Sequence, residues 1–260
     1  MMDAPREFQV TVNGHACRVW EKGEGAPLGF FAGLGGAIRW SPFLDALAQR
    51  RRVIVPSLPG FPGATGHELL DDLPDWIAAT LDLLEGAGLE GADLIGASVG
   101  GMLAAEVAAL SRATVKRLVL VAPYGLFDAA EPTRDVFAVK PEDLPALLSS
   151  HPERVVAAMT PPEGEDPTEW AILVARAGVA AARLTWPLGE RGLKKRLHRI
   201  KAPTLIVWGA EDRVIPPSYA HRFAAGIPGE VETRTIPGAG HLVDVDAPEE
   251  LARAILEFVG

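Results

Sequence analysis

A serine between a strand-like run and an alanine-rich run is the first feature of the sequence that could do chemistry. Residues 92–95 lead into Gly96-Ala97-Ser98-Val99-Gly100-Gly101, and the segment 102–110 that follows has the composition of a helix. A serine hydroxyl is a weak nucleophile unless it is activated by a neighbouring base. Glycines on both sides of a strand-to-helix turn leave room for the two elements to approach closely there. The pattern predicts a nucleophile elbow with Ser98 at its tip. A serine that only caps a helix would give a similar sequence pattern.

A carboxylate and a base follow Ser98 along the chain, each after a predicted buried strand. Asp212 comes four residues after the run 203–208, and His241 ends a glycine-rich turn after the run 231–236. Ligand sites of open α/β sheets lie beyond the carboxyl ends of the strands. The order serine, acid, histidine is the one that accompanies a nucleophile elbow. We therefore expect His241 to accept the proton of Ser98 and Asp212 to orient the imidazole.

Competing candidates exist for both the base and the acid. His67 follows Gly66 in the loop after the run 52–56, and Asp128 lies just beyond the run 117–122. The Gly-x-x-Asp loop that ends at Asp212 matches the expected pattern better than Asp128 does. Glu211, the acidic residue next to Asp212, is expected to face solvent. The same is expected of the other histidines, which are His15, His151, His198 and His221.

A second glycine-rich turn, Gly33-Leu34-Gly35-Gly36, follows the predicted strand 28–32. Glycines at such a turn let backbone N–H groups approach a ligand closely. We expect the N–H groups of Leu34 and Val99 to form an oxyanion hole. A dinucleotide-binding loop is excluded, because Ile38 stands where its third glycine is required.

Short strand patterns alternate with helical patterns along most of the chain, which is typical of a parallel sheet covered by helices. Asn13-Gly14 separates the first two strands and predicts a hairpin turn. Eight strands are expected, at 7–12, 16–20, 28–32, 52–56, 92–96, 117–122, 203–208 and 231–236. Helices are expected at 40–49, 73–89, 98–111, 218–225 and 248–259. The predicted fold class is α/β, with an eight-stranded, mostly parallel sheet and helices on both of its faces.

About eighty residues separate the sixth strand from the seventh, which is more than one crossover helix needs. Further helices are expected there, at 141–149, 153–159, 168–186 and 192–198. We therefore expect a core of residues 1–122 and 202–260 with an inserted helical cap of residues 123–201. The apolar side of this lid is expected to face substrate, with Trp170, Leu173, Val174, Ala177 and Trp186 as candidates.

The overall composition excludes several classes of function. With 25 Lys+Arg against 34 Asp+Glu, the net charge of -9 has the wrong sign for gathering nucleic acid or anionic membrane by bulk electrostatics. Cys17 is the single cysteine, so an internal disulfide and a cysteine-based zinc site are both excluded. Residues 1–6 lack the pattern of an export signal, and a cytoplasmic location is expected. We expect a small-molecule substrate, no cofactor and no bound metal, and we leave homo-oligomer formation open.

Taken together, these features resemble the α/β-hydrolase family, and in particular its small lidded members. Those members include bacterial esterases, haloperoxidase-like enzymes without a cofactor, and meta-cleavage hydrolases that break carbon-carbon bonds. The resemblance covers nearly the whole chain and rests on residues 33–36, 52–61, 96–101, 208–216 and 238–241. The family commonly has His-Gly where Ala32-Gly33 stands here, and Asp where Ser57 stands.

The resemblance implies a serine hydrolase that works through an acyl-enzyme, with carboxylic esters of a small to medium hydrophobic acyl group as expected substrates. One alternative is a meta-cleavage hydrolase, for which Arg176 or Arg183 could supply a cation from the lid. An alternative of another class is a ligand-binding protein that keeps the fold without catalysis. Such proteins usually lose a member of the triad, whereas all three residue types are present here.

Overall fold

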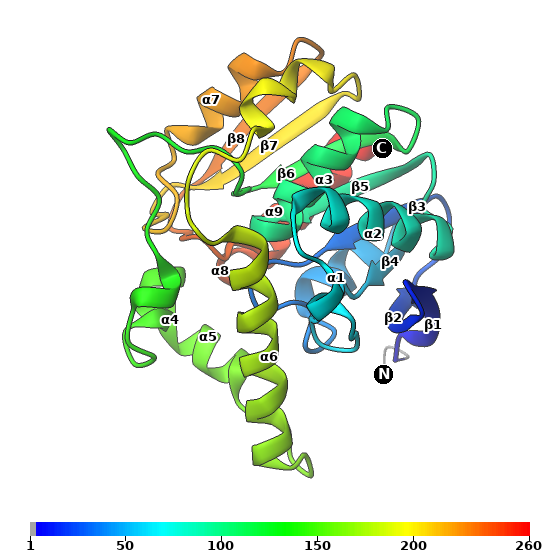
Figure 1. Cartoon of the computed structure of the whole chain (residues 1–260), viewed down its shortest axis with the longest axis vertical. Coiled ribbons are helices and arrows are strands. Elements are labelled where there is room, and N and C mark those ends of the chain that lie inside the picture. Colours follow the sequence, from blue (N-terminus) through cyan, green and yellow to red (C-terminus); the bar gives the residue numbers. More distant parts are fainter. Residues whose placement is uncertain (1–3) are drawn as a thin grey trace.

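The computed structural model describes residues 4–260, and its central element is the eight-stranded sheet that the sequence predicts (Figure 1). The strands are β1 Arg6–Val12, β2 His15–Lys22, β3 Pro27–Phe31, β4 Arg52–Pro56, β5 Ala92–Ala97, β6 Val115–Val121, β7 Thr204–Gly209 and β8 Val231–Ile236. Their order across the sheet is β1-β2-β4-β3-β5-β6-β7-β8. Strand β2 pairs antiparallel with both of its neighbours, and the other pairs are parallel.

The predicted hairpin joins β1 to β2 with Val12 opposite His15. Asn13 and Gly14 adopt φ angles of +50° and +79°. These are the left-handed conformations that a tight turn between two antiparallel strands requires, and asparagine and glycine adopt them most readily. The prediction of the turn is confirmed.

Both faces of the central strands are buried, because neighbouring strand residues belong to different hydrophobic clusters. In β7, Ile206 and Trp208 pack on one side, while Leu205 and Val207 pack on the other. The first cluster also holds apolar residues of α2, α3 and α7, and the second holds those of α1 and α9. A strand buried on both faces reads as a continuous apolar run, as β7 does. The prediction that the strand 231–236 is buried is wrong, because β8 lies at an edge of the sheet and only its Ile236 is buried. The predicted α/β class with helices on both faces is confirmed.

The helices of the core are α1 Pro42–Ala48, α2 Leu73–Gly86, α3 Ser98–Leu110, α7 Tyr219–Gly226, α8 Val243–Asp246 and α9 Pro248–Val259, with a 3-10 turn η1 at His67–Leu69. The five predicted helices begin and end close to the predicted bounds, and α8 and the turn η1 were not predicted. The hydroxyl of Ser41 accepts from the Leu44 N–H at the start of α1, and Asp72 forms a capping box with Asp75 at the start of α2. Among the residues from 4 to 260, no helix is both long and apolar enough to cross a membrane.

The segment between β6 and β7 is helical, as expected, and part of it packs against the first hydrophobic cluster, through residues such as Leu184 and Leu197. It contains η2 Val136–Ala138, α4 Leu144–Leu148, α5 Pro152–Met159, α6 Pro167–Thr185, η3 Leu193–Lys195 and η4 Leu197–Arg199. Figure 1 shows α4, α5 and α6 grouped together, with α6 projecting beyond the sheet. We refer to residues 123–201 as the inserted segment.

The helix predicted at 192–198 is wrong, because this stretch forms two separate 3-10 turns. Gly192 has a φ of +94°, and the Arg196 guanidinium donates to both carboxylate oxygens of Glu106 in α3 at 2.7 Å. Leu193 and Leu197 are fully buried. Tertiary packing against the core therefore overrides the local helical pattern.

Candidate active site

Ser98 is the first residue of α3 and follows directly on β5. Its φ of +52° is unusual for a residue other than glycine and turns the chain sharply from strand to helix. A Cβ at Gly96 would lie 2.5 Å from the Gly100 carbonyl oxygen, and one at Gly100 would lie 2.5 Å from that of Ala32. Glycine is required at both positions because the neighbouring atoms belong to the backbone.

The structure brings Ser98, Asp212 and His241 together in one buried chain of hydrogen bonds. The Ser98 Oγ lies 2.8 Å from Nε2 of His241, and Nδ1 of His241 lies 2.9 Å from Oδ2 of Asp212. The three residues are only 2%, 7% and 2% exposed, in the order Ser98, Asp212, His241. A carboxylate beside Nδ1 favours the tautomer with its proton there, which leaves Nε2 free to accept from the serine hydroxyl.

The carboxylate of Asp212 is held by donors on both oxygens. Oδ1 accepts from the N–H groups of Val214 and Ile215 at 2.8 and 3.0 Å. Oδ2 accepts from the indole N–H of Trp208 at 3.1 Å, in addition to His241. These bonds fix the orientation of the carboxylate, since hydrogen bonds to an ionised group are stronger than neutral ones.

Close approach of two turns brings the acid and the base together. Gly209 ends β7, and a Cβ there would lie 2.1 Å from the Gly240 carbonyl oxygen. The Glu211 N–H donates to the Ala239 carbonyl at 2.9 Å. The loop that carries Asp212 and the loop that carries His241 therefore pack backbone against backbone at the carboxyl ends of β7 and β8.

The two other candidates for base and acid, His67 and Asp128, take no part in the hydrogen bonds that join Ser98, His241 and Asp212. The carboxylate of Asp128 pairs with Arg222 and accepts from the Ala130 N–H at 2.9 Å. That backbone N–H, together with the Arg222 guanidinium, lowers the pKa of Asp128. His67 lies beside Glu68 at 3.2 Å, and the Glu211 carboxylate is exposed and accepts from the Ser150 hydroxyl at 2.9 Å.

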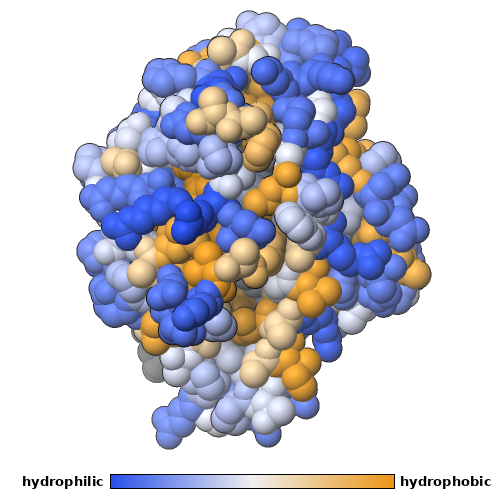
Figure 2. Space-filling model, turned by 60° about the vertical axis from the view of Figure 1, so that its left-hand side comes forward, coloured by the Kyte–Doolittle hydropathy of each residue, from blue (hydrophilic) through white to orange (hydrophobic). Residues whose placement is uncertain are grey.

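A cavity of about 280 Å³ opens onto Ser98 and His241. Leu34 contributes to its wall, and Val99 is the second residue of α3, where the first N–H groups of a helix have no acceptor within it. A Cβ at Gly33 would lie 3.1 Å from that of Ser98, so the predicted oxyanion-hole turn lies against the elbow. On the face drawn in Figure 2, apolar surface gathers in a hollow framed by hydrophilic surface.

The prediction of which residues of the inserted segment line the cavity is mostly wrong. Of the five apolar candidates in α6 and just after it, only Val174 lines the cavity. Trp186 is 57% exposed, and the Trp170 indole N–H donates to the Met159 carbonyl at 2.6 Å. The wall on this side comes instead mainly from η2, α4 and α5, through Val136, Phe137, Leu144, Leu148, Val155, Ala158 and Met159.

The two arginines considered as a lid cation also lie outside the cavity wall. Arg176 is exposed. The Arg183 guanidinium donates to the Leu70 carbonyl at 3.2 Å and lies 3.5 Å from the Asp71 carboxylate. Neither guanidinium is placed to meet a carboxylate on a ligand inside the cavity.

A family model described as "Alpha/beta hydrolase family" matches residues 14–254. The chain belongs to the α/β-hydrolase family. It is 31% identical to the dihydrolipoyllysine-residue acetyltransferase component of the acetoin cleaving system of Pseudomonas putida, over 98% of this chain and 70% of that protein. It is 27% identical to the 2-hydroxy-6-oxo-6-(2'-aminophenyl)hexa-2,4-dienoic acid hydrolase of Metapseudomonas resinovorans, over 96% of this chain and 89% of that one. It is 28% identical to the pimeloyl-[acyl-carrier protein] methyl ester esterase of Xanthomonas campestris pv. campestris, over 85% of this chain and 89% of that one.

Two residues near the site of this α/β hydrolase were not foreseen from the sequence. The Tyr124 ring lies edge-on to the His241 imidazole, with ring centroids 5.8 Å apart. The backbone N–H of Tyr124 donates to the Ser98 carbonyl at 3.0 Å. Burial raises the pKa of Tyr124, so its phenol stays neutral and can only pack or share its proton. The second residue is Asp246. The sequence gives no local sign of either role, because Tyr124 contacts His241 and Asp246 contacts Ser149 and Ser150, all of which are distant along the chain.

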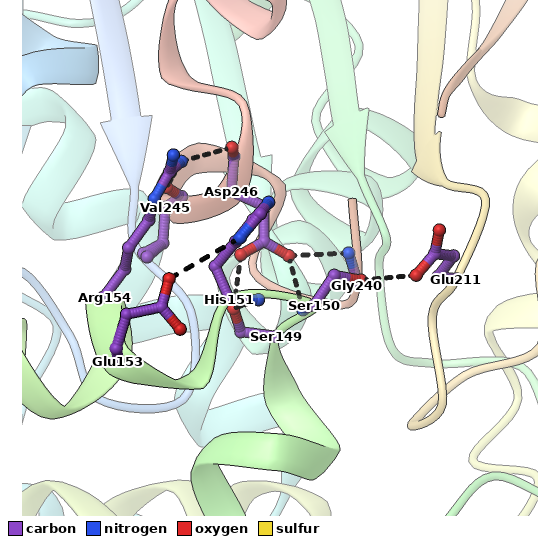
Figure 3. A network of polar contacts seen from close by, with 9 residues as sticks. All are labelled: Ser149, Ser150, His151, Glu153, Arg154, Glu211, Gly240, Val245 and Asp246. Atoms are coloured by element: carbon purple, nitrogen blue, oxygen red, sulfur yellow. Dashed lines mark hydrogen bonds and ion pairs between the residues drawn. The ribbon is translucent and has the colours of Figure 1, made fainter. Parts of the chain in front are cut away.

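Asp246 connects the histidine loop to the inserted segment (Figure 3). Its carboxylate accepts from the Gly240 N–H at 2.7 Å and from the Ser150 N–H at 3.0 Å, and also from the Ser149 hydroxyl. The Arg154 guanidinium of α5 donates to the Asp246 carbonyl at 2.7 Å. The backbone before His241 and the start of α5 are thus held by one buried residue.

We predict that Asp246→Asn lowers both stability and turnover of this α/β hydrolase. The amide can satisfy only part of the three donors, and each buried donor left without an acceptor costs about 1–3 kcal/mol. Because Gly240 precedes His241, we also expect kcat to fall by at least about tenfold, since small misplacement of a catalytic group is costly. Urea unfolding and steady-state kinetics measure the two effects. Glu211→Gln, which alters an exposed acceptor of Ser150, is the control, and equal behaviour of both variants would contradict the prediction.

Proposed function

We propose that this protein is a serine hydrolase that cleaves carboxylic esters through an acyl-enzyme. The observation that carries the proposal is the continuous hydrogen-bond chain from Ser98 through His241 to Asp212, at 2.8 and 2.9 Å, beside an apolar cavity. A nucleophile, a base and an orienting carboxylate in this sequence of contacts are the parts that acyl transfer needs. Similarity to an esterase of the same family adds support.

In the proposed reaction the Ser98 oxygen attacks the ester carbonyl carbon while Nε2 of His241 takes the hydroxyl proton. The carbonyl π electrons move to its oxygen, which becomes an oxyanion, and Asp212 stabilises the imidazolium. The tetrahedral intermediate then collapses, the alkoxide leaves, and His241 returns the proton to it. Water deprotonated by the same imidazole attacks the acyl-enzyme, and a second collapse releases the acid and restores the Ser98 hydroxyl.

The proposed donors to the oxyanion are the N–H groups of Leu34 and Val99. Val99 lies at the start of α3, where the helix dipole also favours negative charge. Leu34 lies in the turn after β3, beside the elbow. Each donor in such a hole contributes about 3 kcal/mol to stabilising the transition state.

The walls of the cavity suggest which substrates fit. They are formed mostly by aliphatic side chains and glycines, so an acyl group of small to medium size without charge on most of its length would be buried favourably. We further propose that residues 123–201 act as a cap on a core of residues 1–122 and 202–260. Leu148 and Met159 reach the cavity from that segment.

A second candidate function is carbon-carbon hydrolysis of a ring-fission dienoate, which the similarity to a dienoic acid hydrolase favours. Such substrates carry a carboxylate, and among residues 4–260 no lysine or arginine lines the cavity. The ester therefore fits better. A ligand-binding role without catalysis is the third possibility, and the intact chain of contacts argues against it.

The test is a series of p-nitrophenyl esters from acetate to octanoate, assayed beside one ring-fission dienoate. We expect the best ester to exceed the dienoate in kcat/KM by at least about 100-fold, because an unpaired carboxylate is costly to bury. Faster turnover of the dienoate would reverse the order of the two functions. Binding of these compounds without turnover of any would favour the non-catalytic role.

A further inference from the structure

One acidic residue lies in the wall of the otherwise apolar cavity. Asp244 is in α8, three residues after His241, and lines the same cavity as Ser98. Within the described residues, Asp244 and His241 are the titratable side chains of that wall. An acidic residue is not needed by the proposed reaction, in which Asp212 already serves His241. Its presence therefore calls for another role.

The carboxylate of Asp244 differs from the two neighbouring carboxylates in its partners. Asp212 and Asp246 each accept several hydrogen bonds from other residues. For Asp244, by contrast, no other residue between 4 and 260 donates a hydrogen bond to the carboxylate. The fold leaves this carboxylate free to accept a partner from a ligand.

Burial raises the pKa of Asp244 to about 6, opposed mainly by its own N–H and by the nearby imidazole of His241. Repulsion from Asp246 acts in the same direction as burial. At neutral pH the group is still mostly ionised, but its charge is poorly compensated. A cation brought by a ligand would supply the compensation that the protein does not.

We propose that Asp244 selects substrates, favouring acyl compounds that carry a cationic ammonium group and disfavouring those that carry a carboxylate. The proposal rests on the proposed ester hydrolysis, and it deepens it by naming the charge of the substrate. An ammonium group within the cavity meets one carboxylate and no lysine or arginine among the described wall residues. A carboxylate in the same place meets repulsion from Asp244, and no lysine or arginine among the described wall residues offsets it.

The experiment compares esters that differ in charge but hardly in shape. The p-nitrophenyl esters of 4-(trimethylammonio)butanoate and 5,5-dimethylhexanoate place a cationic or a neutral group of the same form at the same position, and the glutarate monoester places a carboxylate there. We expect wild-type kcat/KM for the cationic ester to exceed that for its neutral counterpart by at least about tenfold, the effect of one pKa unit of charge interaction. The glutarate monoester is expected to be slower than the neutral ester by a similar factor.

Asp244→Asn removes the charge at nearly constant volume, and we expect the ratio of cationic to neutral kcat/KM to fall to about 1–2. The ratio is measured on one preparation, so partial misfolding of the variant affects numerator and denominator equally. Glu249→Gln removes an exposed carboxylate near the start of α9 and should keep the wild-type ratio. A wild-type ratio near one, or a ratio that survives Asp244→Asn, would overturn the proposal.

The ratio should also depend on pH. Protonation of Asp244 removes the negative charge that attracts the cationic ester. The preference for that ester is therefore expected above a pH of about 6 and is lost below it. The two esters share the same catalytic groups, and Asp246 and Arg154 are engaged in the contacts of Figure 3. A ratio constant from pH 5 to 8 would count against Asp244 as its source.

A separate readout distinguishes this proposal from the proposed function. If none of the esters is turned over, ester hydrolysis is wrong, and calorimetric binding of choline against 3,3-dimethylbutan-1-ol still tests the charge preference. Tighter binding of choline to wild type than to Asp244→Asn, with no such difference for the neutral alcohol, would support Asp244. Equal binding of the two alcohols to wild type would reject it.

Discussion

Replacing Ser98 with alanine is expected to lower kcat for p-nitrophenyl esters by about 10⁵-fold and to abolish labelling by a fluorophosphonate probe. Removal of a serine nucleophile leaves only the contribution of the oxyanion hole and of binding. The single hydrogen bond that the change removes is the one from Ser98 Oγ to His241. Alanine at this position keeps the same strained backbone, so the free energy of unfolding should fall by no more than about 1–3 kcal/mol, which is the cost of a buried polar group without its partner.

The same variant tests whether the three residues act as a unit. His241→Ala alone should cost nearly as much as Ser98→Ala, and the double variant should be little slower than either. Ser111→Ala, at the other end of α3, is the control and should label at the wild-type rate. Labelling that persists in Ser98→Ala, or losses that multiply in the double variant, would exclude the proposed nucleophile.

The part of the fold that could be predicted from sequence is the part whose signals are local. The turn at Asn13-Gly14, the strands 52–56 and 231–236 and the elbow at Ser98 each depend on residues adjacent in the chain. Asparagine and glycine mark the hairpin turn and the elbow by residue type, and short runs with turn residues beside them mark the strands. The glycine turn before His241 is of the same kind, which is why its position beyond β8 could be anticipated.

The lining of the cavity could not be predicted in the same way. The helical period of α6 shows that one side is apolar, but not whether that side meets ligand, core or solvent. Packing leaves Trp186 exposed and brings Val155 and Met159 of α5 to the wall instead. Asp244 gives no sign in the sequence, since α8 is four residues long and its two acids, Asp244 and Asp246, resemble any surface residues. Such positions depend on contacts between distant segments.

Asp212→Asn is expected to lower kcat by about 10⁴-fold with little change in KM. The reason lies in which oxygen each donor occupies. Oδ1 accepts from two backbone N–H groups, those of Val214 and Ile215, so the amide oxygen of asparagine must lie there. The amide NH₂ then faces Nδ1 of His241. Because NH₂ only donates hydrogen bonds, Nδ1 must accept one and cannot carry the proton. The imidazole proton moves to Nε2, where it blocks transfer from Ser98.

Steady-state kinetics and the rate of fluorophosphonate labelling measure this effect together, and both should fall by a similar factor, because the same proton transfer activates Ser98 in each. Asp128→Asn is the matched control, since Asp128 was the competing acid and its carboxylate pairs with Arg222 instead. We expect that variant to keep kcat within about twofold of wild type, as for an exposed ion pair. Comparable losses in the two variants, or a loss below tenfold in Asp212→Asn, would show that Asp212 does not set the tautomer of His241, and the proposed mechanism would need another acid.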